Sequence, residues 1–114
     1  MILIFKHIFR RNYIGLTLWP LIILRNHDLK QDEVLLNHER IHLKQQRELL
    51  VIPFYFLYFF EWIYRSIKYR DSYKAYKNIS FEREAYQNEL DLTYLENRRS
   101  WHFLKYIRQN GPKY

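Results

Sequence analysis

A run of twelve uncharged residues, LLVIPFYFLYFF at positions 49–60, limits the folds available to this chain more strongly than any other feature. As a helix it would be about 18 Å long, whereas the hydrocarbon core of a bilayer is about 30 Å thick. Extending it to eighteen residues brings in Glu61 and Arg65, so we do not expect a simple membrane span. A helix that is apolar on every side must pack between other elements or lie in a membrane interface.

The composition favours a single, mostly helical domain. The 114 residues include only two glycines and three prolines, which leaves few turn residues and favours long helices. The absence of cysteine excludes disulfides and thiolate metal sites. The net charge of +7 favours contact with anionic surfaces, but the 19 Lys and Arg residues are dispersed, so we do not expect a nucleic-acid partner.

Residues 1–31 are expected to form a strand or hairpin region. Positions 15–25 (GLTLWPLIILR) are rich in β-branched and large apolar residues, which favour strands. Pro20 has no N–H to donate, so we expect an edge strand or two short pieces there, followed by a turn at 26–31. An edge strand could bind an extended peptide or could simply cover the helices, and both interpretations stay open.

Residues 1–9 (MILIFKHIF) do not have the features of a secretory signal. They are apolar, but the charges of Arg10 and Arg11 follow the apolar region instead of preceding it. We therefore expect a location in the cytoplasm or on the cytoplasmic face of the membrane. His7 has no histidine at helical spacing, so we interpret it as an ordinary core or surface residue.

Two histidines four residues apart mark the next segment, which we expect to be a helix over residues 32–50. Asp32 is a suitable N-cap, and apolar residues recur at helical spacing after it. His38 and His42 share one face of such a helix, about 5–6 Å apart at Cβ, where both can bind one Zn²⁺. Glu39 lies about 100° around the helix, where its carboxylate can take a proton from a metal-activated water.

A zinc ion held by two histidines needs a third protein ligand and an open position. Glu82 and Glu84 belong to the segment FEREA and lie about 200° apart around a helix, so only one of them can face the ion. We favour Glu82 and keep Glu84 as the alternative. His102 is expected to be exposed.

Three further side chains are candidates for support of the site. Tyr86 is four residues after Glu82, on the same helix face, and a tyrosine there can hydrogen-bond a developing oxyanion. Tyr76 is a second candidate for this role. Gln45, one turn after His42, could orient a ligand, bind substrate or be purely structural.

The aromatic helix expected at residues 51–70 suggests a membrane partner. Pro53 suits its first turn and separates it from the histidine helix. Arg65, Lys68 and Arg70 suit an anionic leaflet, so we consider peripheral contact with an anionic membrane. Several side chains in this helix are of types found at headgroup level: Tyr55, Tyr58, Trp62, Tyr64 and Tyr69.

The last third of the chain is expected to contain two more helices, after a short helix or loop at 71–78. Residues 80–98 should form the helix with the third ligand, capped by Ser80. Residues 100–109 should form a C-terminal helix. Its core-facing residues are expected to be Trp101, Leu104 and Ile107.

Taken together, HERIH at 38–42 and FEREA at 81–85 resemble the gluzincins, zinc metallopeptidases with H-E-x-x-H on one helix and a glutamate ligand on a later one. The likeness is greater to short bacterial proteins that combine a strand, H-E-x-x-H-x-x-Q and N…F-E-R-E-A. It covers most of the chain. Tyr86 stands where gluzincins place Asp or Asn, so the group that steadies a ligand is missing or comes from elsewhere.

The resemblance implies that His38, His42 and Glu82 bind one Zn²⁺ and that Glu39 is the general base. It implies a peptide or protein substrate. We therefore expect an α+β, predominantly α-helical fold, with a strand or hairpin and about four helices around the histidine helix. The expected function is a zinc-dependent metallohydrolase, most simply a peptidase. The alternative is a non-catalytic, zinc-stabilised interaction protein at a membrane surface.

Overall fold

The computed structural model describes residues 2–6 and 14–107. The fold is α+β and predominantly helical, as expected. Residue 1 and residues 7–9 of the N-terminal segment, including His7, lie outside the described residues. Among those that are described, no helix combines the length and the apolar character needed to cross a membrane.

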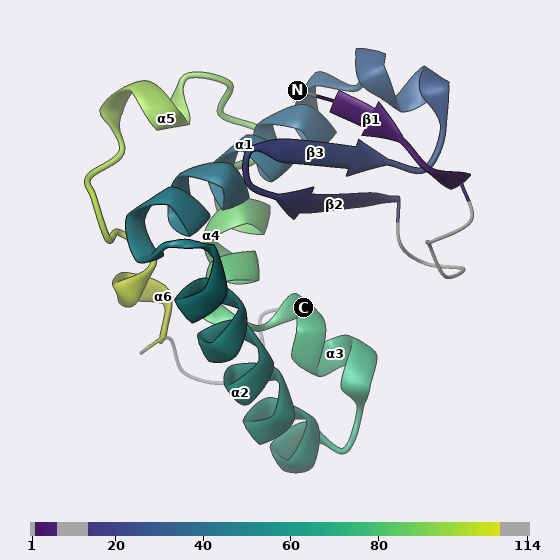
Figure 1. Cartoon of the computed structure of the whole chain (residues 1–114). Coiled ribbons are helices and arrows are strands. Elements are labelled where there is room, and N and C mark those ends of the chain that lie inside the picture. The colour runs from purple at the N-terminus through teal and green to yellow at the C-terminus, as the bar shows by residue number, and fades with distance from the viewer. Residues whose placement is uncertain (1, 7–13, 108–114) are drawn as a thin grey trace.

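A small mixed sheet forms the N-terminal part (Figure 1). Strand β3 (Leu21–Leu24) lies in the middle, parallel to β1 (Ile2–Ile4) and antiparallel to β2 (Gly15–Leu18). Strands β2 and β3 are joined by Trp19 and Pro20 through a cis peptide bond. The segment with Pro20 at its centre therefore forms two short strands, because the proline lies in the turn and not in a ladder.

Helix α1 (Glu33–Leu49) follows a 3-10 helix, η2 (His27–Gln31), and packs against β2 and β3. As expected, Asp32 caps α1, because its side chain accepts a hydrogen bond from Leu35 N at 3.0 Å. Helix α2 (Val51–Tyr69) begins two residues later, with Pro53 in its first turn. In Figure 1, α2 extends away from the sheet, and α3 (Ser72–Lys77) lies alongside it.

Helix α4 (Ser80–Asn88) carries Glu82 and is shorter than the helix expected at 80–98. That expectation is wrong because Asn37 of α1 ends the helix: its Nδ2 donates to the carbonyl oxygens of residues 88, 89 and 91. The chain then turns before α5 (Tyr94–Asn97). Termination at this point brings residues 89–98 back over α1 and α4.

The expected N-cap of α4 is also wrong. Ser80 is the first residue of the helix, and its N–H and hydroxyl both donate to the Glu61 carboxylate of α2, at 2.7 and 2.6 Å. A carboxylate satisfies free N–H groups there and complements the positive end of the helix dipole. The Glu61 carboxylate of α2 thus takes the part that the side chain of an N-cap residue usually has.

The C-terminal helix α6 (Leu104–Ile107) buries a different face from the expected one. Trp101, Leu104 and Ile107 are about half exposed, whereas Phe103 and Tyr106 are buried. The expectation assumed a regular helix over 100–109, but Trp101 has a φ of 63°, so the chain turns before α6 begins. Residues 108–109 lie outside the described part of the chain.

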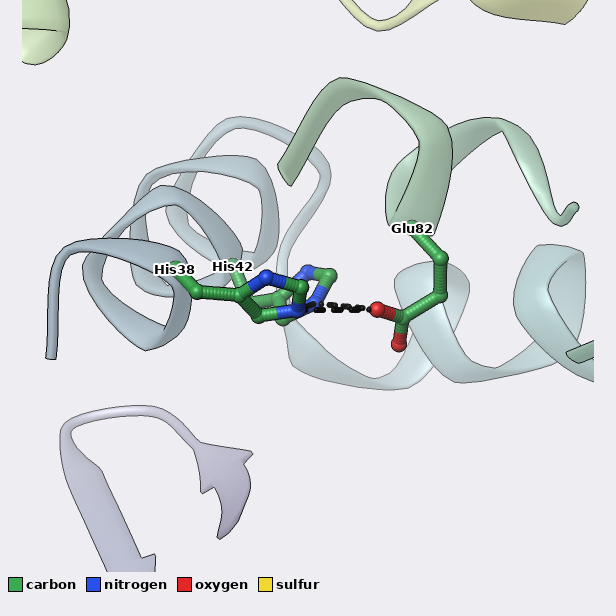
Figure 2. A group of neighbouring side chains, drawn as sticks. All are labelled: His38, His42 and Glu82. Atoms are coloured by element: carbon green, nitrogen blue, oxygen red, sulfur yellow. Dashed lines mark hydrogen bonds and ion pairs between the residues drawn. The ribbon is translucent and has the colours of Figure 1, made fainter. Parts of the chain in front are cut away.

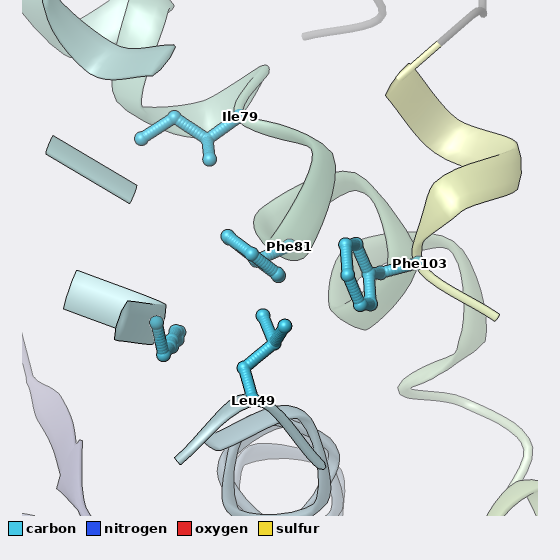
Figure 3. Packing of buried hydrophobic residues seen from close by; sticks show 5 residues of the cluster. Leu49, Ile79, Phe81 and Phe103 are labelled. Atoms are coloured by element: carbon cyan, nitrogen blue, oxygen red, sulfur yellow. The ribbon is translucent and has the colours of Figure 1, made fainter. Parts of the chain in front are cut away.

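Two apolar clusters hold these elements together. One joins the sheet to α1 through Ile22, Leu24 and Leu36. The other joins α1, α2, α4 and the segment before α6, and its side chains point toward one another in Figure 3. It contains Leu49, Phe54, Ile79, Phe81 and Phe103. This second cluster fixes α4 against α1 and so sets the distance between Glu82 and the two histidines.

Candidate metal centre

The side chains of His38 and His42 on α1 meet that of Glu82 on α4, as Figure 2 shows. The two Nε2 atoms are 3.2 Å apart. Glu82 Oε1 is 3.1 Å from His38 Nε2 and 2.9 Å from His42 Nε2. All three residues are buried. Three ligand atoms of the types that bind divalent metals thus form one small triangle.

The outer nitrogen of each imidazole is held by an acceptor. His38 Nδ1 lies 2.7 Å from Glu89 Oε2, and His42 Nδ1 lies 2.8 Å from Gln45 Oε1. The amide nitrogen of Gln45 donates to Phe81 O and to Glu84 Oε1, so its oxygen must face His42. Both histidines therefore carry a proton on Nδ1, and Nε2 is the ring atom that faces Glu82 and would be left to bind a metal ion.

Glu82 is also held in place by a second contact. Its Oε2 accepts a 2.5 Å hydrogen bond from Tyr58 OH of α2, while Oε1 faces the histidines. Tyr58 was expected among the headgroup-facing aromatic residues, but it points into the domain. Tyr55 does so as well, since its hydroxyl donates to Thr17 O. Helix α2 therefore supports the centre from one side.

The electrostatic environment favours positive charge at this point. Burial lowers the pKa of His38, but the hydrogen bonds to Glu82 and Glu89 outweigh it and raise the pKa to about 10. Burial lowers the pKa of His42 too, yet the charge of Glu82 brings it above its ordinary value. Burial alone would raise the pKa of Glu82, but the two imidazoles hold it well below its usual range. The charge of the buried Glu82 carboxylate can therefore be compensated either by protonated imidazoles or by a bound metal ion.

Glu39 lies on the sheet side of α1, outside the triangle. Its Oε2 accepts a 2.5 Å hydrogen bond from Thr17 Oγ1 of β2. A Cβ added to Gly15 would lie 2.7 Å from Glu39 Oε1, so the glycine provides the space that this carboxylate occupies. Strand β2 therefore positions the Glu39 side chain in two ways: Thr17 hydrogen-bonds its carboxylate, and Gly15 leaves room for it.

A cavity of about 270 Å³ lies beside the triangle. Its lining includes Gly15, His38, Glu39, Tyr76, Tyr86 and Glu89. The Tyr86 ring meets the His38 ring edge-on, with 4.5 Å between the centroids. Burial and the charge of Glu82 raise the pKa of both phenols, so Tyr76 and Tyr86 stay protonated and can donate hydrogen bonds. The residues around the cavity thus include an imidazole, two phenols and the carboxylates of Glu39 and Glu89.

Glu84, the alternative third ligand, faces away from the histidines and belongs to a separate buried network. Its carboxylate accepts hydrogen bonds from Arg98, from Tyr94 OH at 2.6 Å and from Gln45 Nε2 at 2.9 Å. The Arg98 guanidinium also binds both carboxylate oxygens of Glu48, at 2.7 and 3.1 Å. His102 is half-buried, packs against Tyr94 and Tyr106, and lies outside the triangle.

Sequence reasoning missed four residues that hold the centre: Thr17, Tyr58, Glu89 and Arg98. Tyr58 lies on α2 and Glu89 directly follows α4. No local sequence pattern determines how these helices are rotated toward α1. Thr17 lies between two leucines in β2, a pattern that would place the threonine outward and the leucines inward, whereas the structure buries the threonine. Comparisons of the chain with protein-family models, curated proteins and solved structures found no match.

Proposed function

We propose that this chain is a zinc-dependent metallohydrolase that cleaves peptide bonds. The observation that carries the proposal is the cavity, because it is bordered both by a candidate ligand, His38, and by a candidate general base, Glu39. A purely structural site would need no access to a neighbouring carboxylate.

The ligand atoms fit a zinc ion. With Zn–N and Zn–O bonds of about 2.0–2.2 Å, two ligands of a tetrahedral ion are separated by about 3.3 Å. The three separations here are 2.9, 3.1 and 3.2 Å. Two imidazoles and one carboxylate are also a donor set found in catalytic zinc sites. The same set accepts other divalent ions, and zinc is the proposed one.

The proposed chemistry divides between the ion and the residues around it. A bound Zn²⁺ would polarise the scissile carbonyl and lower the pKa of a water to about 7. Glu39 would take the proton of the attacking water and pass it to the leaving amine. Tyr86 or Tyr76 would donate a hydrogen bond to the oxygen that gains negative charge.

An extended peptide is the proposed substrate because β2 is an edge strand beside the cavity. At its far end this edge is already covered: Gln46 binds Thr17 O and Trp19 N, at 2.8 and 2.6 Å. The Gly15 end lines the cavity next to Glu39. A peptide would therefore approach along this end of the strand, with its backbone near the candidate base.

Zinc analysis and the variant Glu39→Gln test the proposal together. We expect one zinc ion per chain in both proteins, and hydrolysis of a mixed peptide library by the natural chain alone. The amide cannot accept the proton, so the rate should fall at least hundredfold. Arg40→Gln, on the exposed side of α1, is the matched control and should keep full activity.

Unchanged hydrolysis in Glu39→Gln would refute this mechanism. One zinc ion per chain without turnover of any peptide would instead support the non-catalytic alternative. In that case the ion joins α1 to α4 in a small domain, and a chelator should lower the melting temperature without another functional effect.

The space at Gly15 gives a second test of the base. Gly15→Ala is expected to displace the Glu39 carboxylate, because its Cβ would lie 2.7 Å from Oε1. A misplacement of about 1 Å can reduce the rate on the order of a hundredfold. Circular dichroism and zinc content should be unchanged. Leu16→Ala, in the same strand, serves as control, and equal activity of the two variants would contradict the proposed position of Glu39.

A further inference from the structure

Helix α2 exposes an apolar stripe on the side opposite to the domain. Its members follow one another at spacings of four, three, one, three and four residues, which places them on one helical face. They are Ile52, Phe56, Phe59, Phe60, Ile63 and Ile67. Ile52 and Ile67, near the two ends, are 70% and 74% exposed, and Phe60 between them is 62% exposed. We call these six residues the α2 stripe.

The α2 stripe is not part of either apolar cluster. The side of α2 that packs on the domain carries Phe54, Tyr58 and Trp62 instead. The stripe extends over sixteen residues, and its first and last members are about 22 Å apart along the helix. A continuous apolar surface of this kind on a charged domain marks a contact with an apolar partner.

Positive charge flanks one end of the stripe. Lys68, Arg70 and Lys74 are exposed at the end of α2 and in α3, and none takes part in an ion pair within the described residues. Arg65, expected among these cations, is instead buried and paired with Glu61. Glu61 is also bonded to Ser80, and Asp71 caps α3, so neither carboxylate of this region neutralises the exposed cations. The surface therefore combines apolar contact area with unneutralised cations.

We propose that the α2 stripe docks onto an anionic phospholipid surface, with α2 parallel to the membrane plane. Lipid tails would cover the apolar residues and headgroups would neutralise the flanking cations. Exposed Tyr64 lies between the stripe and Lys68, where an amphipathic ring suits the headgroup level. A second copy of the chain is a poorer partner, because the stripe itself carries no carboxylate that could pair with these cations. The proposal does not depend on the proposed enzymatic function.

Vesicle co-sedimentation of the full chain tests the proposal. We expect binding to vesicles that contain phosphatidylglycerol, weaker binding to phosphatidylcholine alone, and loss of the difference at high salt. Phe56→Gln with Phe60→Gln should weaken binding to both by roughly tenfold or more, since two buried rings are lost. Lys68→Gln should weaken binding to the anionic vesicles by about fivefold, with little effect on the neutral ones.

The matched control is Leu90→Gln with Leu92→Gln, because these leucines are also more than half exposed but lie between α4 and α5. They should leave vesicle binding unchanged, and circular dichroism should show all variants folded. Absence of binding to either vesicle would overturn the proposal, as would equal losses in the control. A dimer that the Phe56 and Phe60 changes convert to a monomer, without any vesicle binding, would also overturn it and assign the stripe to a second copy.

Discussion

Glu82→Ala is expected to abolish stoichiometric zinc binding and hydrolysis together. The change removes the one carboxylate oxygen that lies within 3.1 Å of both Nε2 atoms. Changing a residue that only orients a zinc ligand typically lowers metal affinity 10–100-fold. Loss of the ligand itself should therefore exceed a hundredfold.

Isothermal titration calorimetry with zinc and metal analysis after dialysis would measure this effect. Glu89→Gln provides a graded comparison, because the Glu89 carboxylate contacts the outer nitrogen of His38 and not the ligand atoms of the triangle. We expect Glu89→Gln to keep one ion per chain with affinity reduced about 10–100-fold. If Glu82→Ala bound zinc as tightly as Glu89→Gln, Glu82 would not be a ligand.

Arg98→Met is expected to lower the free energy of unfolding by about 3–5 kcal/mol, a large part of the total for a small domain. The Arg98 side chain is completely buried and paired with two carboxylates, Glu84 and Glu48. Methionine retains most of the apolar volume but leaves both carboxylates without their cation. Most of the loss therefore comes from buried negative charge that is no longer compensated.

Urea unfolding followed by circular dichroism would measure this loss. Arg99→Met is the matched control, since the neighbouring arginine is exposed, and its effect should stay within about 0.5 kcal/mol. Adding Glu84→Gln and Glu48→Gln to Arg98→Met should recover part of the stability, because the buried charges are then removed. Equal stability of Arg98→Met and Arg99→Met would contradict the role assigned to this ion pair.

The same arginine is linked to the candidate metal centre through a series of hydrogen bonds. Arg98 and the Gln45 amide both donate hydrogen bonds to the Glu84 carboxylate. The Gln45 oxygen in turn accepts a hydrogen bond from His42 Nδ1. Gln45 is therefore buried beside the histidines because it connects Glu84 to His42, although it is not one of the three candidate ligands. It also gives Glu84 a role that its position in the FEREA segment did not reveal.

The sequence alone was sufficient to predict features that depend on interactions between residues close together in the chain. The four-residue spacing places His38 and His42 on one face of any helix, and Asp32 caps that helix with its own side chain. Pro20 cannot donate in a ladder, so the apolar segment around it had to divide. The helix of residues 51–69 is long, apolar and free of internal glycine, and its bounds follow from the sequence.

Only the tertiary structure determined how segments far apart in the sequence meet. The ends and the rotations of the helices depend on contacts between elements, which no local pattern contains. Asn37 terminates α4, and the turn that follows brings Glu89 to His38 and Arg98 to Glu84. The separation between Glu82 and the histidines depends on apolar packing of α4 against α1. Which face of α2 is covered was equally undetermined by its sequence, since apolar residues occupy nearly every side of that helix.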